Sequence, residues 1–411
     1  MKPFFQVQDV AQVHALAGAL SPLPAEEAPL DQCLGRSLAQ DLKAPHDLPG
    51  FTRATMDGFA VRAADTFGAG EANPGYLQLV GEVHMGQDPA FSLRPGQCAR
   101  IGTGGMLPQG ADAVVMLEHT RQLDPESVEV ASSLAPGANT LGPSDDAAQG
   151  QVLLPAGHWL RPQDLGLLAA LGQERVAVVR RPVVGIVSTG DEVVPTSAQP
   201  GPGQVRDVNT YTLAAQVRQA GGRSLPLGLV PDQAPAIKAA AARSLESCDL
   251  TLLSGGSSVG ARDFTREVFL SFPGAELLVH GVAVSPGKPF LWVQAGVQHL
   301  LGLPGQVASC LVAFYLLVGP ILERLQGRPA LPFARFPRLP AMLGRNLPSA
   351  PGREEYVRVA LAREGRVWRA APLFGKSGLL TTLIQGQGLV RVPKDSEGLY
   401  AGDEVDVLLF P

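Results

Sequence analysis

The sequence has few charged residues and no surplus of basic ones. Only 17% of its 411 residues are charged, and 33 Lys and Arg stand against 38 Asp and Glu, for a net charge of −5. A nucleic-acid-binding protein needs a basic surplus to neutralise phosphates, so we expect no such partner. No stretch approaches the roughly 18 uninterrupted apolar residues of a membrane span. Residues 1–6 lack the apolar core of a signal peptide, so we expect no export.

Cysteine and histidine are too scattered to form a zinc site. The four cysteines are far apart and form no CxxC pair, and the seven histidines show no HxH, HxxxH or HExxH spacing. Without an export signal, the thiols of Cys33, Cys98, Cys248 and Cys310 are expected to be reduced. These absences favour a cytoplasmic protein without structural zinc.

The residues that are abundant indicate a globular chain of several domains. Hydrophobic residues make up 45% of the sequence, and 47 Gly and 36 Pro indicate many turns. Changes in apolar periodicity predict an α/β multidomain protein. The predicted domains are a discontinuous, elongated, helical N-terminal domain (1–46 and 140–181), an inserted β-rich domain (47–139), a central doubly wound α/β domain (182–328) and a small C-terminal β-barrel (329–411). For the last of these, a small β-sandwich is the alternative.

The central domain has the clearest pattern. Buried-strand runs at Val183–Val187, Leu250–Leu253 and Leu300–Leu303 alternate with helical patterns such as Ala234–Ser247 and Val307–Leu325. Strands that alternate with helices of this length predict a mostly parallel sheet. In such a sheet, ligands bind beyond the carboxyl ends of the strands.

Three polar loops follow these strands: Ser188–Glu192, Ser254–Asp263 and Pro304–Gln306. In the second loop, glycines allow close approach of a ligand, serines donate hydroxyls, and a helix N-terminus follows, which together favour a phosphate-bearing ligand. The alternative is a tight turn with a helix cap. Ser258 also lies in a GxSxG match, but the helix is expected to begin only at Phe264, which disfavours the nucleophile elbow of a hydrolase.

Acidic residues follow successive strands of the predicted sheet. Asp191, Glu192, Asp232 and Asp263 would meet at one edge, and carboxylates there suit Mg²⁺. For any one of them alone, a helix cap or a turn is the better explanation, and the metal-site interpretation depends on all four together. Lys288 lies in a rigid Pro-Gly-Lys-Pro frame, where it could hold an anion or remain a solvated surface residue.

Taken together, these motifs resemble the molybdopterin molybdenumtransferase family, the MoeA and gephyrin E-domain proteins, over nearly the whole chain. Thr55–Ala60 is similar to the family segment Ser-x-Met-Asp-Gly-Tyr-Ala, and Arg100–Asp112 to its second signature. Ser144–Asp146 lies where the family has Gly-Glu-Asp. The three central loops follow in order, and Gly375–Gly378 matches the C-terminal Gly-Ser loop in part.

The resemblance implies insertion of molybdate into the dithiolene of molybdopterin, or of its adenylylate, with Mg²⁺. It also implies a homodimer in which each site is shared between the central domain of one subunit and the inserted domain of the other. Transient contact with the molybdopterin adenylyltransferase and with apo-molybdoenzymes would accompany that role. The alternatives are a non-catalytic molybdopterin-binding or scaffold protein of the same fold, a tungstate-preferring insertase, and an enzyme that acts on another pterin or nucleotide.

The predicted site residues combine the loop analysis with this resemblance. Catalytic roles fall to Asp57, Thr103, Asp146, Glu192, Asp232 and Asp263, and Glu192, Asp232 and Asp263 are also the predicted metal ligands. The predicted binding residues are Ser254, Gly255, Gly256, Ser257, Ser258, Gly260, Arg262, Lys288, Pro304, Ser309, Arg353 and Ser377.

Three departures from the family pattern concern anion binding. Ser285 and Gly281 stand where the family often has Lys, Gln306-Val307 replaces Asn-Pro, and Leu141 replaces Arg. We hypothesise that Arg262 returns part of the lost positive charge, since an Arg can bind an oxyanion bidentately. The alternative is that Arg262 is solvated in the first turn of its helix.

Overall fold

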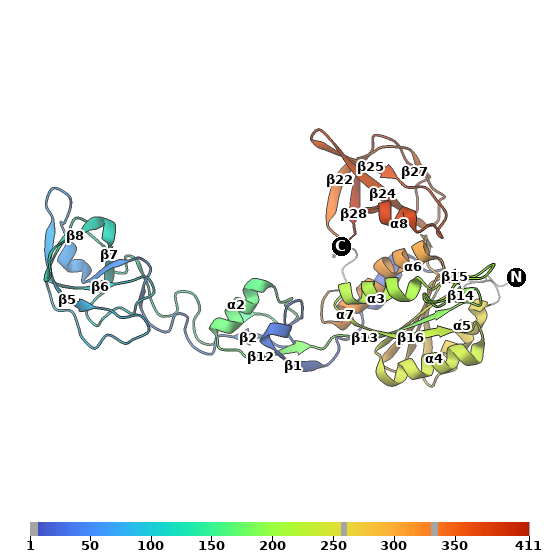
Figure 1. Cartoon of the computed structure of the whole chain (residues 1–411), viewed down its shortest axis with the longest axis horizontal. Coiled ribbons are helices and arrows are strands. Elements are labelled where there is room, and N and C mark those ends of the chain that lie inside the picture. The colour runs from blue at the N-terminus through green and yellow to red at the C-terminus, as the bar shows by residue number, and fades with distance from the viewer. Residues whose placement is uncertain (1–6, 256–260, 330–335, 411) are drawn as a thin grey trace. The chain divides into compact units, whose positions relative to one another are not determined.

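The structure is a computed structural model that describes residues 7–255, 261–329 and 336–410 (Figure 1). The chain forms two compact units. The first comprises residues 1–39, 157–165 and 175–411, and the second comprises residues 40–156 and 166–174. The four finer domain boundaries expected from the sequence stay a prediction.

The second unit is built on a six-stranded sheet. Its strand order is β7 (Ala113–Met116), β4 (Gly58–Val61), β6 (Gln97–Ile101), β5 (Gly75–Glu82), β9 (Ser127–Val130) and β8 (Thr120–Asp124). Only β5 and β6 pair in parallel. Two short ladders join β3 (Arg53–Ala54) to β10 (Thr140–Leu141) and β2 (Leu42–Lys43) to β11 (Val152–Leu154). Short 3₁₀ turns lie at Ala63–Thr66 and Leu117–His119.

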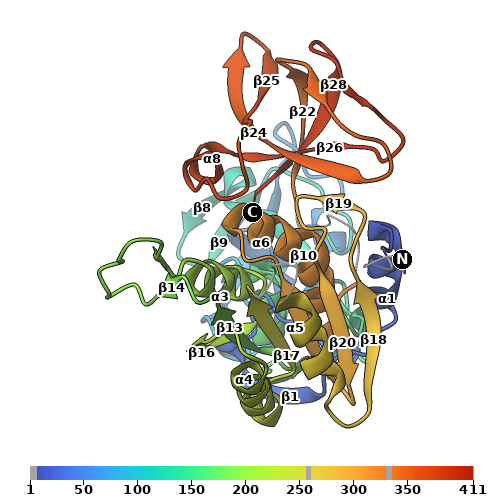
Figure 2. The same ribbon diagram turned by 90° about the vertical axis from the view of Figure 1, so that its right-hand side faces the viewer.

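The first unit holds the predicted doubly wound sheet. Its strand order is β16 (Arg223–Val230), β13 (Val183–Thr189), β17 (Leu250–Ser254), β21 (Gln298–Leu303), β20 (Leu291–Ala295) and β18 (Ala275–His280). The first four strands run parallel. The fifth strand, β20, is antiparallel to both of its neighbours, β21 and β18. One face packs against α3 (Asn209–Gln219), α6 (Val307–Ala313) and α7 (Gly319–Leu325), and the other against α4 (Ala234–Ser247) and α5 (Ala261–Leu270) (Figure 2).

Burial on both faces explains why the central strands are mostly apolar along their whole length. All five residues of β17 are buried, because helices cover the sheet on either side. The run Val307–Leu325 consists of α6, a π-helical turn at Phe314–Val318, and α7. It is long and apolar enough to cross a membrane, but 72% of its most apolar window is buried inside the protein, which is typical of a core helix.

The C-terminal part of the first unit is a closed barrel, as predicted. Its five strands are β24 (Glu354–Glu364), β25 (Val367–Pro372), β22 (Arg338–Leu343), β28 (Glu404–Leu409) and β26 (Gly388–Val392), and β26 pairs again with β24 to close the ring. Beside it lie β19 (Val284–Ser285), β23 (Leu347–Pro348), β27 (Gly398–Leu399) and α8 (Thr381–Gln385).

The remaining elements of the first unit are short. The opening helix α1 (Val10–Gly18) packs against α7, and β1 (Ala25–Pro29) pairs with β12 (Arg175–Val179). A 3₁₀ turn follows at Leu30–Gln32, and β14 (Val193–Val194) pairs with β15 (Val205–Arg206). Helix α2 (Pro162–Ala170) begins in the first unit and continues into the second at Gly166. Two predicted helices begin earlier than expected: α3 starts at Asn209 rather than Tyr211, and α5 starts at Ala261 rather than Phe264.

Candidate functional site

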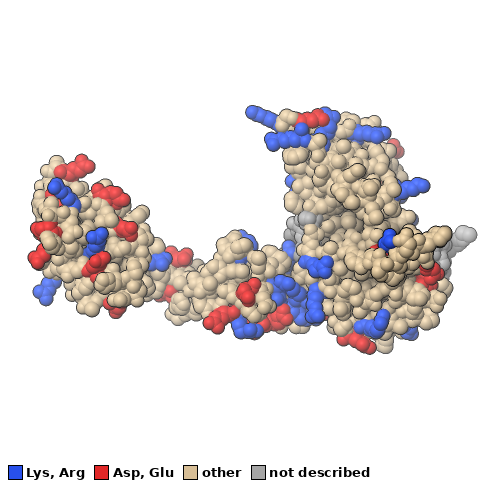
Figure 3. Space-filling model, in the orientation of Figure 1, with Lys and Arg blue, Asp and Glu red and all other residues tan. Residues whose placement is uncertain are grey.

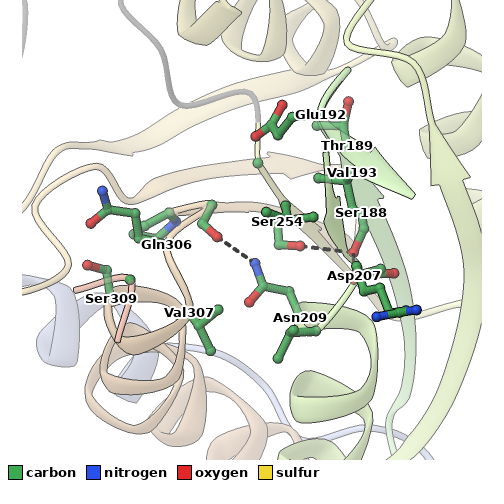
Figure 4. Close-up of a pocket in the computed structure, with 18 of the residues that line it drawn as sticks. Ser188, Thr189, Glu192, Val193, Asp207, Asn209, Ser254, Gln306, Val307 and Ser309 are labelled. Carbon is green, nitrogen blue, oxygen red and sulfur yellow. Dashed lines mark hydrogen bonds between the residues drawn. The ribbon is translucent and has the colours of Figure 1, made fainter. Parts of the chain in front are cut away.

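A cavity of about 730 Å³ lies at the carboxyl ends of β13, β17 and β21 (Figure 4). The loops after these strands, the β14–β15 segment and the barrel residues Gly378 and Leu380 form its walls. Its lining residues are Ser188, Thr189, Gly190, Glu192, Val193, Val205, Arg206, Asp207, Val208, Asn209, Asp232, Ser254, Gly255, Pro289, Pro304, Gly305, Gln306, Val307, Ser309, Gly378 and Leu380. The cavity therefore lies where a parallel sheet binds ligands.

The cavity brings together six of the predicted site residues: Ser254, Gly255, Glu192, Asp232, Pro304 and Ser309. Three others are not part of its lining. Lys288 is exposed and precedes the lining residue Pro289. The carbonyl of Ser377 accepts a hydrogen bond from the backbone N–H of Ala308 (3.0 Å), which joins the barrel loop to the start of α6. Arg353 is exposed in the turn before β24.

Asp57, Thr103 and Asp146 belong to the second unit. One carboxylate oxygen of Asp57 accepts hydrogen bonds from the backbone N–H of Thr103 (2.7 Å) and from its hydroxyl (2.8 Å). These two bonds lower the pKa of Asp57, with the backbone bond the larger cause. Asp146 is exposed, and its backbone N–H donates to the carbonyl of Leu48 (3.0 Å).

The rest of the predicted Gly/Ser loop cannot be placed against the cavity. Gly256, Ser257, Ser258 and Gly260 lie outside the described residues. Arg262 and Asp263 are in the first turn of α5, but their side chains also lie outside the described part of the chain. Their assignments stay predictions, as does the hypothesis that Arg262 replaces missing lysine charge. Helix α5 begins at Ala261 rather than at Phe264, so the helix start that was used to argue against a nucleophile elbow was wrong.

Gly255 is required by the packing of the sheet. Its φ is +115°, and a Cβ at this position would lie 1.9 Å from the carbonyl oxygen of Thr189 on the neighbouring strand. Only glycine fits so close an approach with this backbone. The sequence pattern suggested that glycine admits a ligand, but at this position the structure gives an intramolecular reason.

A network of hydroxyls and one buried carboxylate supports the cavity. The Ser188 hydroxyl donates to Asp207 Oδ1 (3.2 Å) and also contacts the hydroxyls of Thr210 (2.8 Å) and Ser254 (3.2 Å). Asp207 Oδ1 also accepts from the backbone N–H of Thr210 (3.1 Å) in the first turn of α3. The side-chain amide of Asn209 donates to the Gly305 carbonyl (2.8 Å), a bond drawn as the dashed line from Asn209 in Figure 4. Sequence reasoning missed this network, although an Asp before a helix is a recognisable cap signal.

Asp232 is the most perturbed acid in the cavity. Burial raises its pKa, and the negative charges of Asp191 and Glu192 raise it further. Its backbone N–H donates to Asp191 Oδ1 (3.3 Å), and its own Oδ1 is buried without a hydrogen-bond partner among the described residues. No group of three or more His, Cys, Asp or Glu among the described side chains is arranged to hold a metal ion. The metal assignment to Glu192, Asp232 and Asp263 therefore stays a prediction.

Arg358 is a second residue that sequence reasoning missed. This β24 side chain is only 7% exposed, and its guanidinium donates to Thr382 Oγ1 (2.6 Å) and to the Gly375 carbonyl (3.3 Å). It thereby holds both ends of the barrel loop whose residues Gly378 and Leu380 line the cavity. Burial lowers its pKa, yet an arginine remains charged at neutral pH. No sequence signal separates it from the exposed Arg353.

Comparisons with known proteins match almost the whole chain. Residues 6–172 match the family model of the MoeA N-terminal region (domain I and II), residues 185–324 that of a probable molybdopterin binding domain, and residues 340–410 that of the MoeA C-terminal region (domain IV). The molybdopterin molybdenumtransferase of Bacillus subtilis is 34% identical over 387 residues, 93% of this chain and 89% of that protein.

A second relative and a solved structure are also similar to almost the whole chain. Molybdopterin molybdenumtransferase 2 of Mycobacterium tuberculosis is 33% identical over 387 residues, 92% of this chain and 93% of that protein. The crystal structure of a molybdopterin biosynthesis MoeA protein from Pyrococcus horikoshii has a TM-score of 0.84 at 34% identity, and the match covers 99% of this chain and all of that one.

Proposed function

The chain belongs to the MoeA family of molybdopterin molybdenumtransferases, and on that premise we propose that it inserts molybdenum from molybdate into the dithiolene of molybdopterin or its adenylylate, in the cavity at the carboxyl edge of the central sheet. We choose this cavity as the site because Glu192, Asp232, Ser254 and Ser309 all line it. Carboxylates and hydroxyl donors meet there from separate loops.

The reaction needs protons beside an anionic substrate. Each oxo group that leaves molybdate as water takes two protons, while the dithiolene sulfurs replace it on the metal. Of the acids in the cavity lining, Asp232 is best suited to hold a proton at its carboxyl, because burial and neighbouring negative charges raise its pKa. Asp57, whose pKa is lowered by Thr103, is suited to remain ionised and to hold a cation.

Glu192 and Asp232 fit Mg²⁺ by their chemistry. They are hard oxygen donors on one cavity. Once Asp232 has given up its proton, its unpartnered Oδ1 and the negative charge of Asp191 favour a cation there. Mg²⁺ commonly uses one or two carboxylates and keeps waters, so a set of three protein ligands is not required. When bound, Mg²⁺ would screen the negative charge of the substrates.

The assembly we propose is a cytoplasmic homodimer in which Asp57 of one copy acts beside the cavity of the other. Charge supports it: acidic residues outnumber basic ones by more than two to one in the second unit, whereas basic residues exceed acidic ones in the first. Acidic side chains are widely spread over the face of the second unit shown in Figure 3. Surfaces of opposite charge on two copies can pair.

Complementation between inactive variants tests the shared site. Asp57→Ala and Asp263→Ala proteins, mixed under conditions of subunit exchange, should recover up to about a quarter of wild-type activity, because random pairing gives half heterodimers with one intact site each. No recovery despite demonstrated exchange would place both residues in the site of a single subunit.

Reconstitution tests the function itself. The purified protein is incubated with molybdopterin or its adenylylate, Mg²⁺, and either molybdate or tungstate, and activation of an apo-molybdoenzyme is measured. We expect molybdate-dependent activation that Glu192→Gln abolishes with little change in melting temperature, since an exposed strand-end carboxylate contributes little to folding. If Glu192→Gln is as active as wild type, this cavity is not the site of insertion.

A further inference from the structure

Arg206 is the one Lys or Arg side chain among the described residues that line the cavity. The other ionisable side chains of that lining are the carboxylates of Glu192, Asp207 and Asp232. An anion in the cavity is therefore close to three carboxylates, and its binding requires a positive charge close by. Arg206 is positioned to provide that charge.

Neighbouring backbone holds the Arg206 guanidinium in one orientation. Its Nε donates to the carbonyls of Thr196 (3.2 Å) and Ala198 (3.1 Å), and its Nη2 donates to Gln199 Oε1 (3.2 Å). A guanidinium has five N–H donors, so both donors on Nη1 and one on Nη2 have no acceptor among the described residues. These free donors form the edge that binds two oxygens of a phosphate or another tetrahedral oxyanion.

The charge of Arg206 is also uncompensated within the described part of the chain. No carboxylate lies within ion-pair distance of it, although three carboxylates share its cavity. In contrast, Arg180 in the same unit forms a bidentate ion pair with Asp249. An arginine held only by neutral acceptors keeps its full charge for a ligand.

We propose that Arg206 binds a tetrahedral oxyanion group of the substrates through its Nη edge, either molybdate or the phosphate of the pterin. The inference rests on the proposed function, which brings both anions to this cavity. It assigns to the β14–β15 segment an anion-binding role that the sequence analysis gave to Arg262 and Lys288.

Two variants separate charge from structure. Arg206→Gln removes the guanidinium, whereas Gln199→Glu leaves Arg206 in place but sets a carboxylate against it. Arg218→Gln is the matched control, because Arg218 is an exposed α3 residue outside the cavity lining. Equilibrium titrations with molybdate alone and with molybdopterin alone, at fixed ionic strength, give the dissociation constants. Both test variants should bind one of the anions about tenfold more weakly, the scale of a charged hydrogen bond, and the control should match wild type.

The outcomes distinguish the two anions and the two proposals. Weakened molybdate binding identifies molybdate as the ligand, and weakened molybdopterin binding identifies the pterin phosphate. Arg206 has no such role if both variants bind both anions within twofold of wild type, or if wild type binds neither anion. The proposal is also overturned if only Arg206→Gln is impaired, because Gln199→Glu would strengthen a purely structural contact of Arg206. Failed reconstitution by wild type together with Arg206-dependent anion binding would reject the proposed function but keep the anion site.

Discussion

Gly255→Ala should destabilise the protein through sheet packing, not through ligand access. The new Cβ would lie 1.9 Å from the Thr189 carbonyl oxygen, with φ at +115°. Backbone strain of this kind costs about 1–3 kcal/mol. Moving the strand end to relieve the clash also weakens the hydrogen bond from the Gly255 N–H to the Leu303 carbonyl (3.3 Å), worth about 1 kcal/mol. We expect the free energy of unfolding to fall by about 2–4 kcal/mol.

Urea denaturation measures this loss, and Gly378→Ala is the matched control. Gly378 lines the same cavity, but no atom lies within 4 Å of its added Cβ, so the free energy of unfolding should change by about 0.5 kcal/mol or less. Insertion activity should also fall in Gly255→Ala, because Ser254 and Thr189 shift with the strand ends. Wild-type stability of Gly255→Ala, combined with weaker substrate binding, would refute the packing argument and favour a glycine kept for ligand approach.

Three further predictions concern individual side chains. Thr103→Val removes one of the two hydrogen bonds that lower the pKa of Asp57, so NMR titration should find that pKa closer to its ordinary value; no change would leave the backbone N–H as its sole cause. Asp191→Asn removes a negative charge, so the raised pKa of Asp232 should fall in the same measurement, and a rise would contradict their electrostatic coupling. Arg358→Gln should lower molybdenum insertion about tenfold by releasing the barrel loop, with a melting temperature lowered by only a few degrees. Wild-type activity of Arg358→Gln would show that molybdenum insertion does not depend on the barrel loop that Arg358 holds.

Local pattern was sufficient for the sheet and for part of the site. The runs Val183–Val187 and Leu250–Leu253 are mostly apolar because a parallel sheet is covered on both faces, so their number and spacing predicted the central fold. Parallel strands end at one edge, and for that reason Glu192 and Asp232 could be expected to meet in one cavity.

The motifs were less informative about why a residue is needed. Gly255 belongs to a Gly/Ser loop that suggests a ligand, but the nearby Thr189 carbonyl already requires glycine there. The start of α5 was also predicted too late, at Phe264 instead of Ala261. Arg262 and Asp263 are polar, and the apolar pattern of the helix begins only after them. Periodicity locates the buried face of a helix better than its first turn.

By itself, the sequence determined the strands and helices of the central sheet, the β-rich C-terminal part and the acids that follow the strands, since each depends on the order of residues within one element or loop. The closure of the C-terminal barrel depends on the pairing of β24 with the distant β26, which the tertiary structure decided. Only the tertiary structure decided that Arg358 is buried against the barrel loop while Arg353 is exposed, and that Arg206 is held by Thr196 and Ala198 on the cavity wall. The physical reason is that residue spacing sets which face of an element a side chain occupies, whereas the contacts of that face depend on which distant segments pack against it.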